Sequence, residues 1–274
     1  MLPELTVAQA AVLALLGLSV GTVGALAGVG GGFLLVPALL FLFPDAGPAE
    51  VTVISLTAVF FNAASASVGY RLWRLQDFRT AAILIALAVP AAAAGALINR
   101  VTDRSAFEVV FGVALLRGAA YLIGRSALES RPEEPSTRGR RRTVVERTGR
   151  IYGYRVNEPL TAAIAPVAGF VAGFFGIGGG IINVPVMMIL IRIPKAVAVA
   201  TSQLELTAAA TAALAIHLTF SSDEPSLWLR AGIAGLGAMT GAQIGVRLAP
   251  RVSGRLVLGV IGTGLLIAGG RLLI

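Results

Sequence analysis

The sequence predicts an all-α polytopic membrane protein with two inverted repeats, each composed of a glycine-broken hairpin element and three full spans. Three observations lead to this fold class. The 274 residues are 56% hydrophobic and only 13% charged, whereas soluble domains carry about 25% charged residues. The charges are concentrated between long apolar segments, and one glycine-rich motif occurs at matching places in both halves.

The apolar segments have the length and composition of membrane helices. Uncharged runs of about 18 or more apolar residues are typical of membrane spans. Alanine, leucine, glycine and valine predominate, and small residues allow helices to approach closely within lipid. The first repeat, residues 1–124, contains segments 6–27, 33–43, 51–70, 80–99 and 106–124. The second repeat, residues 159–274, contains segments 160–175, 181–191, 196–218, 231–248 and 256–273.

The segment between the repeats, residues 125–158, contains nine arginines. It shows no apolar periodicity, and we interpret it as a basic cytoplasmic linker that is partly disordered. A basic loop of this kind fixes membrane topology and contacts anionic lipid. The net charge of +8 arises mainly from arginines between the spans. The positive-inside rule explains that distribution, so we expect no nucleic-acid partner.

The loop charges also predict how the halves are oriented. Basic residues place the loops 71–79, 125–158, 192–195 and 247–255 in the cytoplasm, whereas the acidic loops 44–50 and 219–230 fit the outside. The loop after the first glycine motif is therefore outside and the loop after the second is inside, which makes the repeats inverted. The alternative is eight spans in two parallel four-helix repeats, with each glycine run only a kink.

The glycine motif occupies residues 28–37 and returns 148 positions later at residues 176–185, with six of ten positions identical. About 11 residues follow each triple glycine, which as a helix reach roughly 16 Å, or half of a ~30 Å hydrocarbon core. We therefore expect each motif to turn the chain near the middle of the membrane. The alternative is that the glycines only allow a tight helix crossing.

Each glycine turn is predicted to begin a helix, whose first N–H groups carry the positive end of the helix dipole. Two such helix starts facing each other would cradle an anion without lysine or arginine. Broken helices in matching halves are also the usual location of a transporter binding site. The candidate binding residues are Gly30, Gly31, Gly32 and Phe33 in the first half and Gly178, Gly179, Gly180 and Ile181 in the second.

The pattern Gly-x-Gly-Gly-Gly-x-x-x-Val-Pro, present in both halves and followed each time by a serine in a small-residue helix, resembles the sulfite exporter TauE/SafE family. The resemblance covers both membrane halves but not the linker. It implies transport of sulfite, thiosulfate, sulfonates or related small anions across the cytoplasmic membrane. One departure is the carboxylate in Gln203-Leu204-Glu205, where an apolar residue is expected.

From these features we expect a multi-pass protein of the cytoplasmic (inner) membrane that acts as a secondary transporter of small oxyanions by alternating access. Its partners would be a small anionic substrate and the lipid bilayer. An anion channel of the same architecture is the alternative. An intramembrane enzyme is disfavoured by the absence of cysteine, the single histidine and the lack of a metal-ligand set. We expect no cofactor and no metal.

Polar residues in the spans are the remaining candidates. Ser55 and Ser202 lie 147 positions apart on the helices that follow the motifs. Hydrogen bonding to an oxyanion is one role for these serines and for their polar neighbours; bonding within or between helices is the alternative. The other members of this set are Thr57, Asn183, Thr201 and Gln203.

Glu205 is the only acidic residue between Lys195 and Thr219, about ten residues into its span. A carboxylate at that depth usually marks a transport pathway or a proton relay. We therefore assign it to coupling, with the proton as candidate coupling ion; a structural hydrogen bond is the alternative. His217, the only histidine, is near the outer end of the same span and is interpreted as an interfacial residue without a transport role.

Overall fold

The computed structural model describes residues 5–128, 139–221 and 225–273. The first half contains α1 (Val7–Ala27), α2 (Gly32–Leu42), α3 (Pro48–Leu72), α4 (Phe78–Arg100) and α5 (Arg104–Leu128). The second half contains α6 (Glu158–Phe175), α7 (Gly180–Pro185), α8 (Lys195–Ser221), α9 (Pro225–Leu248) and α10 (Gly254–Leu273). A π-helix, η1 (Val186–Leu190), continues α7, and a 3-10 turn, η2 (Ala249–Arg251), follows α9.

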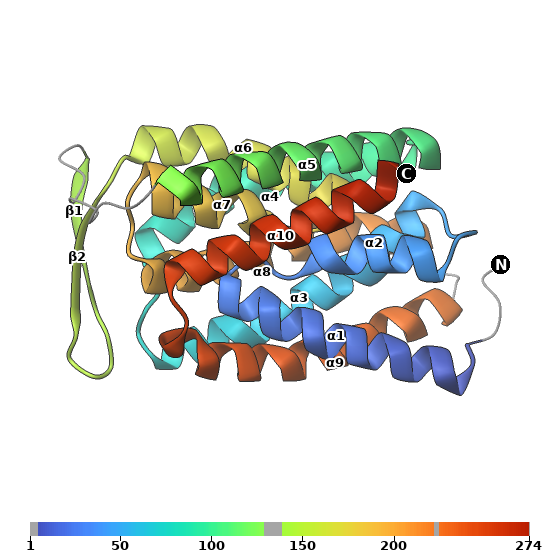
Figure 1. Cartoon of the computed structure of the whole chain (residues 1–274), viewed down its shortest axis with the longest axis horizontal. Coiled ribbons are helices and arrows are strands. Elements are labelled where there is room, and N and C mark those ends of the chain that lie inside the picture. The colour runs from blue at the N-terminus through green and yellow to red at the C-terminus, as the bar shows by residue number, and fades with distance from the viewer. Residues whose placement is uncertain (1–4, 129–138, 222–224, 274) are drawn as a thin grey trace.

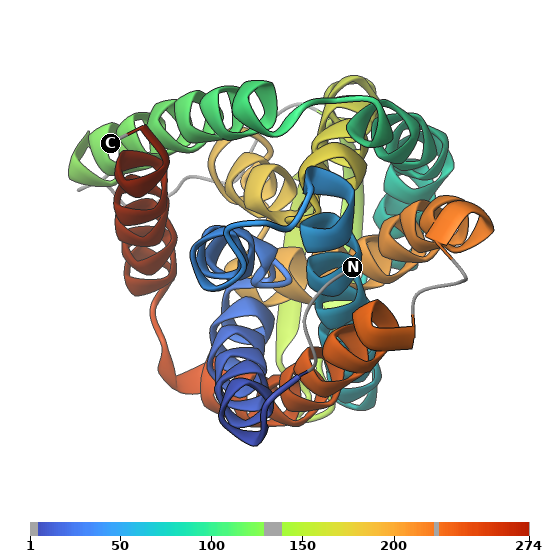
Figure 2. The same cartoon turned by 90° about the vertical axis from the view of Figure 1, so that its right-hand side faces the viewer.

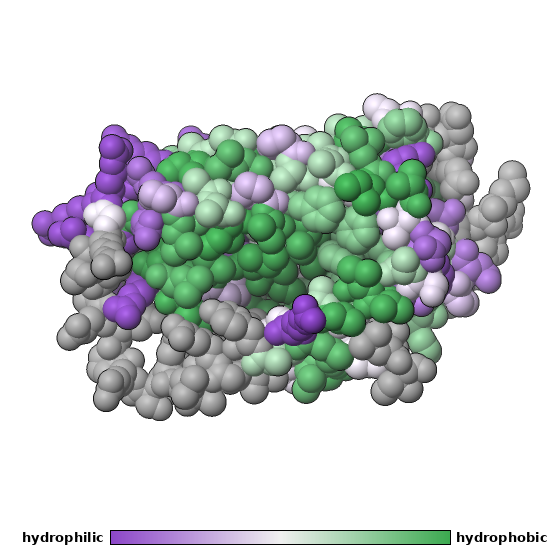
Figure 3. Space-filling view, turned by 90° about the horizontal axis from the view of Figure 1, so that it is seen from above, coloured by the Kyte–Doolittle hydropathy of each residue, from purple (hydrophilic) through white to green (hydrophobic). Residues whose placement is uncertain are grey.

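The described part of the chain is an all-α polytopic membrane protein, apart from one β-hairpin. Within it, α1, α3, α4, α6 and α8 have both the length and the hydropathy that a membrane crossing requires. The space-filling view shows a broad hydrophobic band across the middle of the molecule, with hydrophilic residues gathered at the two ends (Figure 3). Helices of 21 residues such as α1 extend about 31 Å, which matches the hydrocarbon core.

The two short broken helices return toward opposite ends of the bundle (Figure 1). α1 runs inward from the end opposite the β-hairpin, and α2 returns to that end. α6 runs inward from the end that holds the β-hairpin, and the eleven-residue Gly180–Leu190 segment returns there. Each returning segment is too short to cross a membrane, as its length in the sequence predicts.

Hydrogen bonds between loops identify those that meet at each end. At the hairpin end, the Lys195 ammonium donates to the carbonyl oxygen of Ala249 at 2.8 Å, and the Arg147 N–H donates to that of Trp73 at 3.0 Å. At the opposite end, Arg104 Nη1 donates to the Ala46 carbonyl at 2.8 Å. The loops with predicted cytoplasmic charge are therefore gathered at the hairpin end.

Helices of the two halves pack mainly against one another. α1 lies along α9, and α6 lies along α4, while α3 and α8 pack together in the centre. Gly21 on α1 faces the Ala238 backbone, and Gly173 on α6 faces that of Ala92, so that any Cβ at these glycines would overlap the neighbouring helix. The end-on view shows α2 inside the bundle, with α5 and α10 side by side at its edge (Figure 2).

The linker contains a β-hairpin, an element that we did not expect from its sequence. β1 (Arg140–Val145) and β2 (Ile151–Val156) form an antiparallel hairpin, and residues 129–138 lie outside the described ranges. Val144, Tyr154 and Val156 are buried, so an alternating β pattern is present among the arginines. The Tyr154 hydroxyl donates to Asp77 Oδ2 at 2.9 Å, which fastens the hairpin to the loop before α4.

Candidate functional site

The first glycine of each motif ends the incoming helix. Gly28 terminates α1 with φ +78°, and Gly176 terminates α6 with φ +69°. Both are in the left-handed conformation that a helix C-terminus favours and that glycine adopts without strain. In each case the glycine N–H donates to the carbonyl four residues earlier, Gly24 or Ala172.

The backbone conformations of the two turns then differ at one position. Gly30 and Gly178 both have positive φ, +74° and +79°. Gly31 also has a positive φ of +80°, whereas its counterpart Gly179 has φ −65°, an ordinary helical value. The need for left-handed backbone therefore applies to Gly31 but not to Gly179.

The two glycine turns lie directly against each other. A Cβ added to Gly180 would overlap the carbonyl oxygen of Gly28 and lie 2.7 Å from the Val29 Cα. A Cβ added to Gly32 would lie 2.6 Å from the carbonyl oxygen of Gly176. Only glycine allows this approach, so the motif is required at these positions by the contact between the halves.

Two serines hold the turns together in a reciprocal arrangement. The Ser55 hydroxyl on α3 donates to the Gly176 carbonyl at 2.6 Å, and the Ser202 hydroxyl on α8 donates to the Gly28 carbonyl at 2.9 Å. Both serines are fully buried. Each half thus satisfies a backbone carbonyl at the broken helix of the other half, as irregular backbone within a membrane requires.

The returning helices begin without a side-chain cap. Gly31 and Gly179 are the N-caps of α2 and α7, and no side chain caps either helix in the described structure. The amides at the start of a helix have no acceptor within it. Those of Gly32, Phe33, Gly180 and Ile181 form two positive helix ends that meet where the turns touch.

A buried polar pair distinguishes the second half from the first. Asn183 Nδ2 on α7 donates to Glu205 Oε2 on α8 at 2.9 Å, and both residues are about 1% exposed or less. Glu205 Oε1 and Asn183 Oδ1 have no hydrogen-bond partner among the described residues. The Glu205 carboxylate also adjoins the second turn, because a Cβ at Gly179 would lie 3.3 Å from Oε1.

The other predicted polar residues are dispersed. Gln203 Nε2 donates to the Gly24 carbonyl at 3.0 Å, near the end of α1. Thr57 donates to Val53 in its own helix at 2.8 Å. Thr201 accepts from the Asp77 N–H at 3.1 Å, at the hairpin end. Gln203 therefore adjoins the glycine turns, whereas the hydroxyls of Thr57 and Thr201 make structural hydrogen bonds away from them.

Two apolar residues that we did not single out from the sequence cover the turns. Cβ atoms added to Gly30 and Gly178 would lie 3.0 and 3.2 Å from Val59 Cγ1. A Cβ at Gly178 would also lie 2.8 Å from Leu206 Cδ2. Val59 and Leu206 are 147 positions apart, the same offset as Ser55 and Ser202. This shared offset is the sequence signal that could have identified them.

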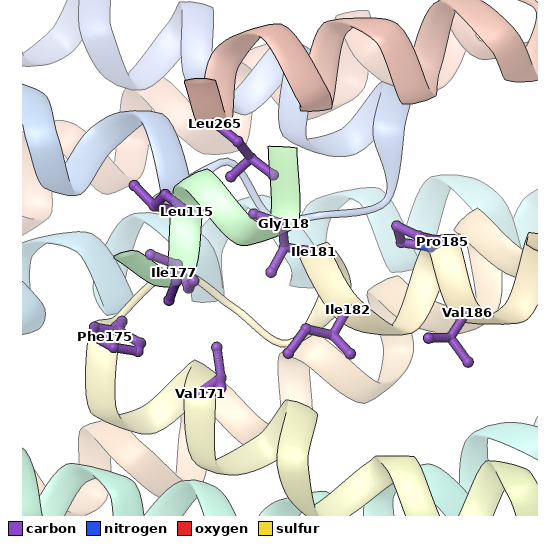
Figure 4. Close-up of a pocket in the computed structure, with 11 residues that line it drawn as sticks. Leu115, Gly118, Val171, Phe175, Ile177, Ile181, Ile182, Pro185, Val186 and Leu265 are labelled. Atoms are coloured by element: carbon purple, nitrogen blue, oxygen red, sulfur yellow. The ribbon is translucent and has the colours of Figure 1, made fainter. Parts of the chain in front are cut away.

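The side chains of Phe33 and Ile181 point away from the turns. The Phe33 ring packs on α10, where a Cβ at Gly264 would lie 2.9 Å from its Cε2. Ile181 lines an apolar cavity of about 220 Å³, which Figure 4 shows between α5, α6, α7 and α10. Its neighbours there include Leu115, Phe175 and Leu265. These two residues can offer only their N–H groups to an anion.

Paired broken helices that meet inside a multi-pass bundle are characteristic of membrane transport proteins. A family model described as sulfite exporter TauE/SafE matches residues 13–272. This chain belongs to that family, as the resemblance in the motifs indicated.

The chain is also similar to probable membrane transporter proteins from three organisms. It is 30% identical over 268 residues to YunE of Bacillus subtilis, with 96% of each chain covered. It is 28% identical over 235 residues to a protein of Xylella fastidiosa, covering 85% of this chain and 82% of the relative. A Methanocaldococcus jannaschii protein is 28% identical over 204 residues, covering 71% and 68%. No solved structure matches.

Proposed function

We propose that this protein is a secondary transporter that moves small oxyanions, of the sulfite, thiosulfate or organosulfonate class, across the cytoplasmic membrane by alternating access. One observation carries the proposal: two uncapped helix starts meet at the glycine turns. Ser55 and Ser202 already occupy the carbonyls of Gly176 and Gly28, so the backbone groups that the two helix starts offer to a ligand are N–H donors. Donors at the positive ends of two helices favour an anion.

We further propose that the halves are inverted repeats, which the hydrogen bonds from Ser55 and Ser202 to the opposite turns support. In alternating access the bound anion is exposed to one side at a time. Val59 and Leu206, which cover the turns from α3 and α8, would then move aside as the anion binds.

Glu205 gives this mechanism a coupling step. An ionised carboxylate beside Gly179 repels an anion at the start of α7, whereas a protonated one does not. Binding of the anion and of a proton at Glu205 therefore favour each other. We propose that the two are carried together, so that a proton gradient drives anion accumulation.

The purified protein tests the proposed substrate class directly. Sulfite, thiosulfate or a small sulfonate should raise its thermal unfolding temperature, because a ligand of the native state at 100 times its Kd stabilises by about 2.7 kcal/mol. In proteoliposomes, unlabelled anion loaded inside should accelerate uptake of labelled anion. A channel would show no such acceleration, and the absence of any binding or uptake with all three anion types would contradict the proposal.

Membrane orientation provides a separate prediction. The chain lacks cysteine, so single cysteines at Gly47 and Arg192 can be labelled individually. A side chain at Gly47 meets nothing within 4 Å, and Arg192 is exposed. We expect an impermeant thiol reagent to label Gly47→Cys from outside and Arg192→Cys only from the cytoplasm. Labelling of both from the same side would exclude the inverted arrangement.

A further inference from the structure

Two basic side chains meet at the end of the bundle opposite the hairpin. Arg100 is the last residue of α4, and His217 lies on the final turns of α8. These helices pack along each other, and the Arg100 guanidinium stacks on the ring of Phe220, which follows His217 by three residues, or about one helical turn, on α8. Neither residue belongs to the glycine turns: His217 is twelve positions beyond Glu205 on the same helix, which is about 18 Å.

The His217 side chain is fully buried. Within the described ranges, neither Nδ1 nor Nε2 has a hydrogen-bond partner. Buried polar atoms are nearly always hydrogen-bonded, and an imidazole carries at least one N–H donor. The side chain therefore requires a partner that the described chain does not provide.

Arg100 presents a second such donor. Its Nη1 is buried and has no hydrogen-bond partner among the residues that the structure describes. The guanidinium carbon lies 4.1 Å from the centre of the Phe220 ring. Stacking on an aromatic face orients the guanidinium and leaves its N–H edge free. That edge is the group that recognises oxyanions.

The position of Arg100 connects this end with the glycine turns. The preceding residue, Asn99, donates through Nδ2 to the Phe174 carbonyl at 2.8 Å and to Thr52 Oγ1 at 3.2 Å. Phe174 lies two residues before Gly176, where α6 ends. Asn99 thus links the end of α4 that carries Arg100 to the last turn of α6, next to the second glycine turn.

We propose that Arg100 and His217 form a second oxyanion-binding site, separate from the glycine turns. Its ligand is a small oxyanion such as sulfate, sulfite or thiosulfate, which accepts from the guanidinium edge and from the imidazole N–H. A role of this site in holding the anion before it reaches the glycine turns rests on the proposed function. Anion binding at Arg100 and His217 does not depend on that function.

The His217 imidazole can be observed individually by NMR, because the chain has no other histidine. In protein labelled with 15N-histidine in lipid nanodiscs, one imidazole is observed. Replacing chloride by sulfate, sulfite or thiosulfate at constant pH and ionic strength should shift its 15N resonances in a saturable manner. Unchanged resonances with all three anions would overturn the site, even if transport by the protein is established.

Two variants test whether Arg100 is the second donor to the anion. Arg100→Gln should raise the dissociation constant measured at His217 about tenfold or more, since a charge-assisted hydrogen bond is lost. Arg79→Gln is the matched control, because Arg79 is exposed at the other end of α4. An Arg100→Gln protein that retains wild-type His217 resonances in the absence of anion is folded at this site. An undiminished response to anion in that protein would overturn the role of Arg100.

Discussion

Glu205→Gln is expected to abolish anion accumulation driven by a pH gradient while anion binding and exchange continue. Glutamine keeps the volume of the buried side chain and can accept the hydrogen bond that Asn183 now donates at 2.9 Å, but it cannot exchange a proton. Uptake into proteoliposomes with and without an imposed pH gradient measures the first effect. Counterflow at equal pH on both sides measures the second.

Asp45→Asn is the control for Glu205→Gln, because Asp45 is an exposed carboxylate in the loop after α2. A second variant combines Asn183→Leu with Glu205→Ala and so gives the second half the residues of the first, Leu35 and Ala58. Removing both buried polar partners together should be tolerated by the fold, and coupling should again be lost. Unchanged pH-driven uptake in either variant would leave Glu205 a structural hydrogen-bonding group.

Gly180→Ala is expected to eliminate transport and to destabilise the protein by about 3 kcal/mol or more, because overpacking here meets rigid backbone. The added Cβ overlaps the Gly28 carbonyl, which accepts from Ser202 at 2.9 Å. The two turns must therefore separate. Thermal unfolding and anion uptake measure the two effects.

Gly232→Ala on α9 is the matched control, since a Cβ there meets nothing within 4 Å. It should unfold and transport like the wild type. If Gly180→Ala also behaves like the wild type, the turns do not need the close contact, and the glycine motif would have to act through backbone conformation alone.

The helix bounds and the glycine turns were largely predictable, because long apolar runs and a duplicated motif are local signals. Which polar residues come into contact was less predictable. Successive helical residues are rotated by about 100°, so Thr57 points away from the face on which Ser55 lies, whereas Val59, four positions on, shares it. Applying this spacing would have replaced Thr57 with Val59 in the predicted site.

Other features depend on contacts between distant segments. The β-hairpin was obscured because arginines dominate residues 140–155, although Val144, Tyr154 and Val156 supply an apolar face. The burial of His217 and its proximity to Arg100 follow from how α4 and α8 pack, which no local pattern contains. The Asn183–Glu205 contact likewise joins residues 22 positions apart on two helices.

The pairing of α1 with α9 has a consequence for biosynthesis. α9 begins at residue 225, roughly 200 residues after α1 ends, and a ribosome adding about 5–20 residues per second needs some 10–40 s to make that length. During this interval the glycine-lined face of α1, including Gly17 and Gly21, has no partner helix. The first half must therefore be held in the membrane in an incomplete state, and its assembly is timed by the arrival of the second.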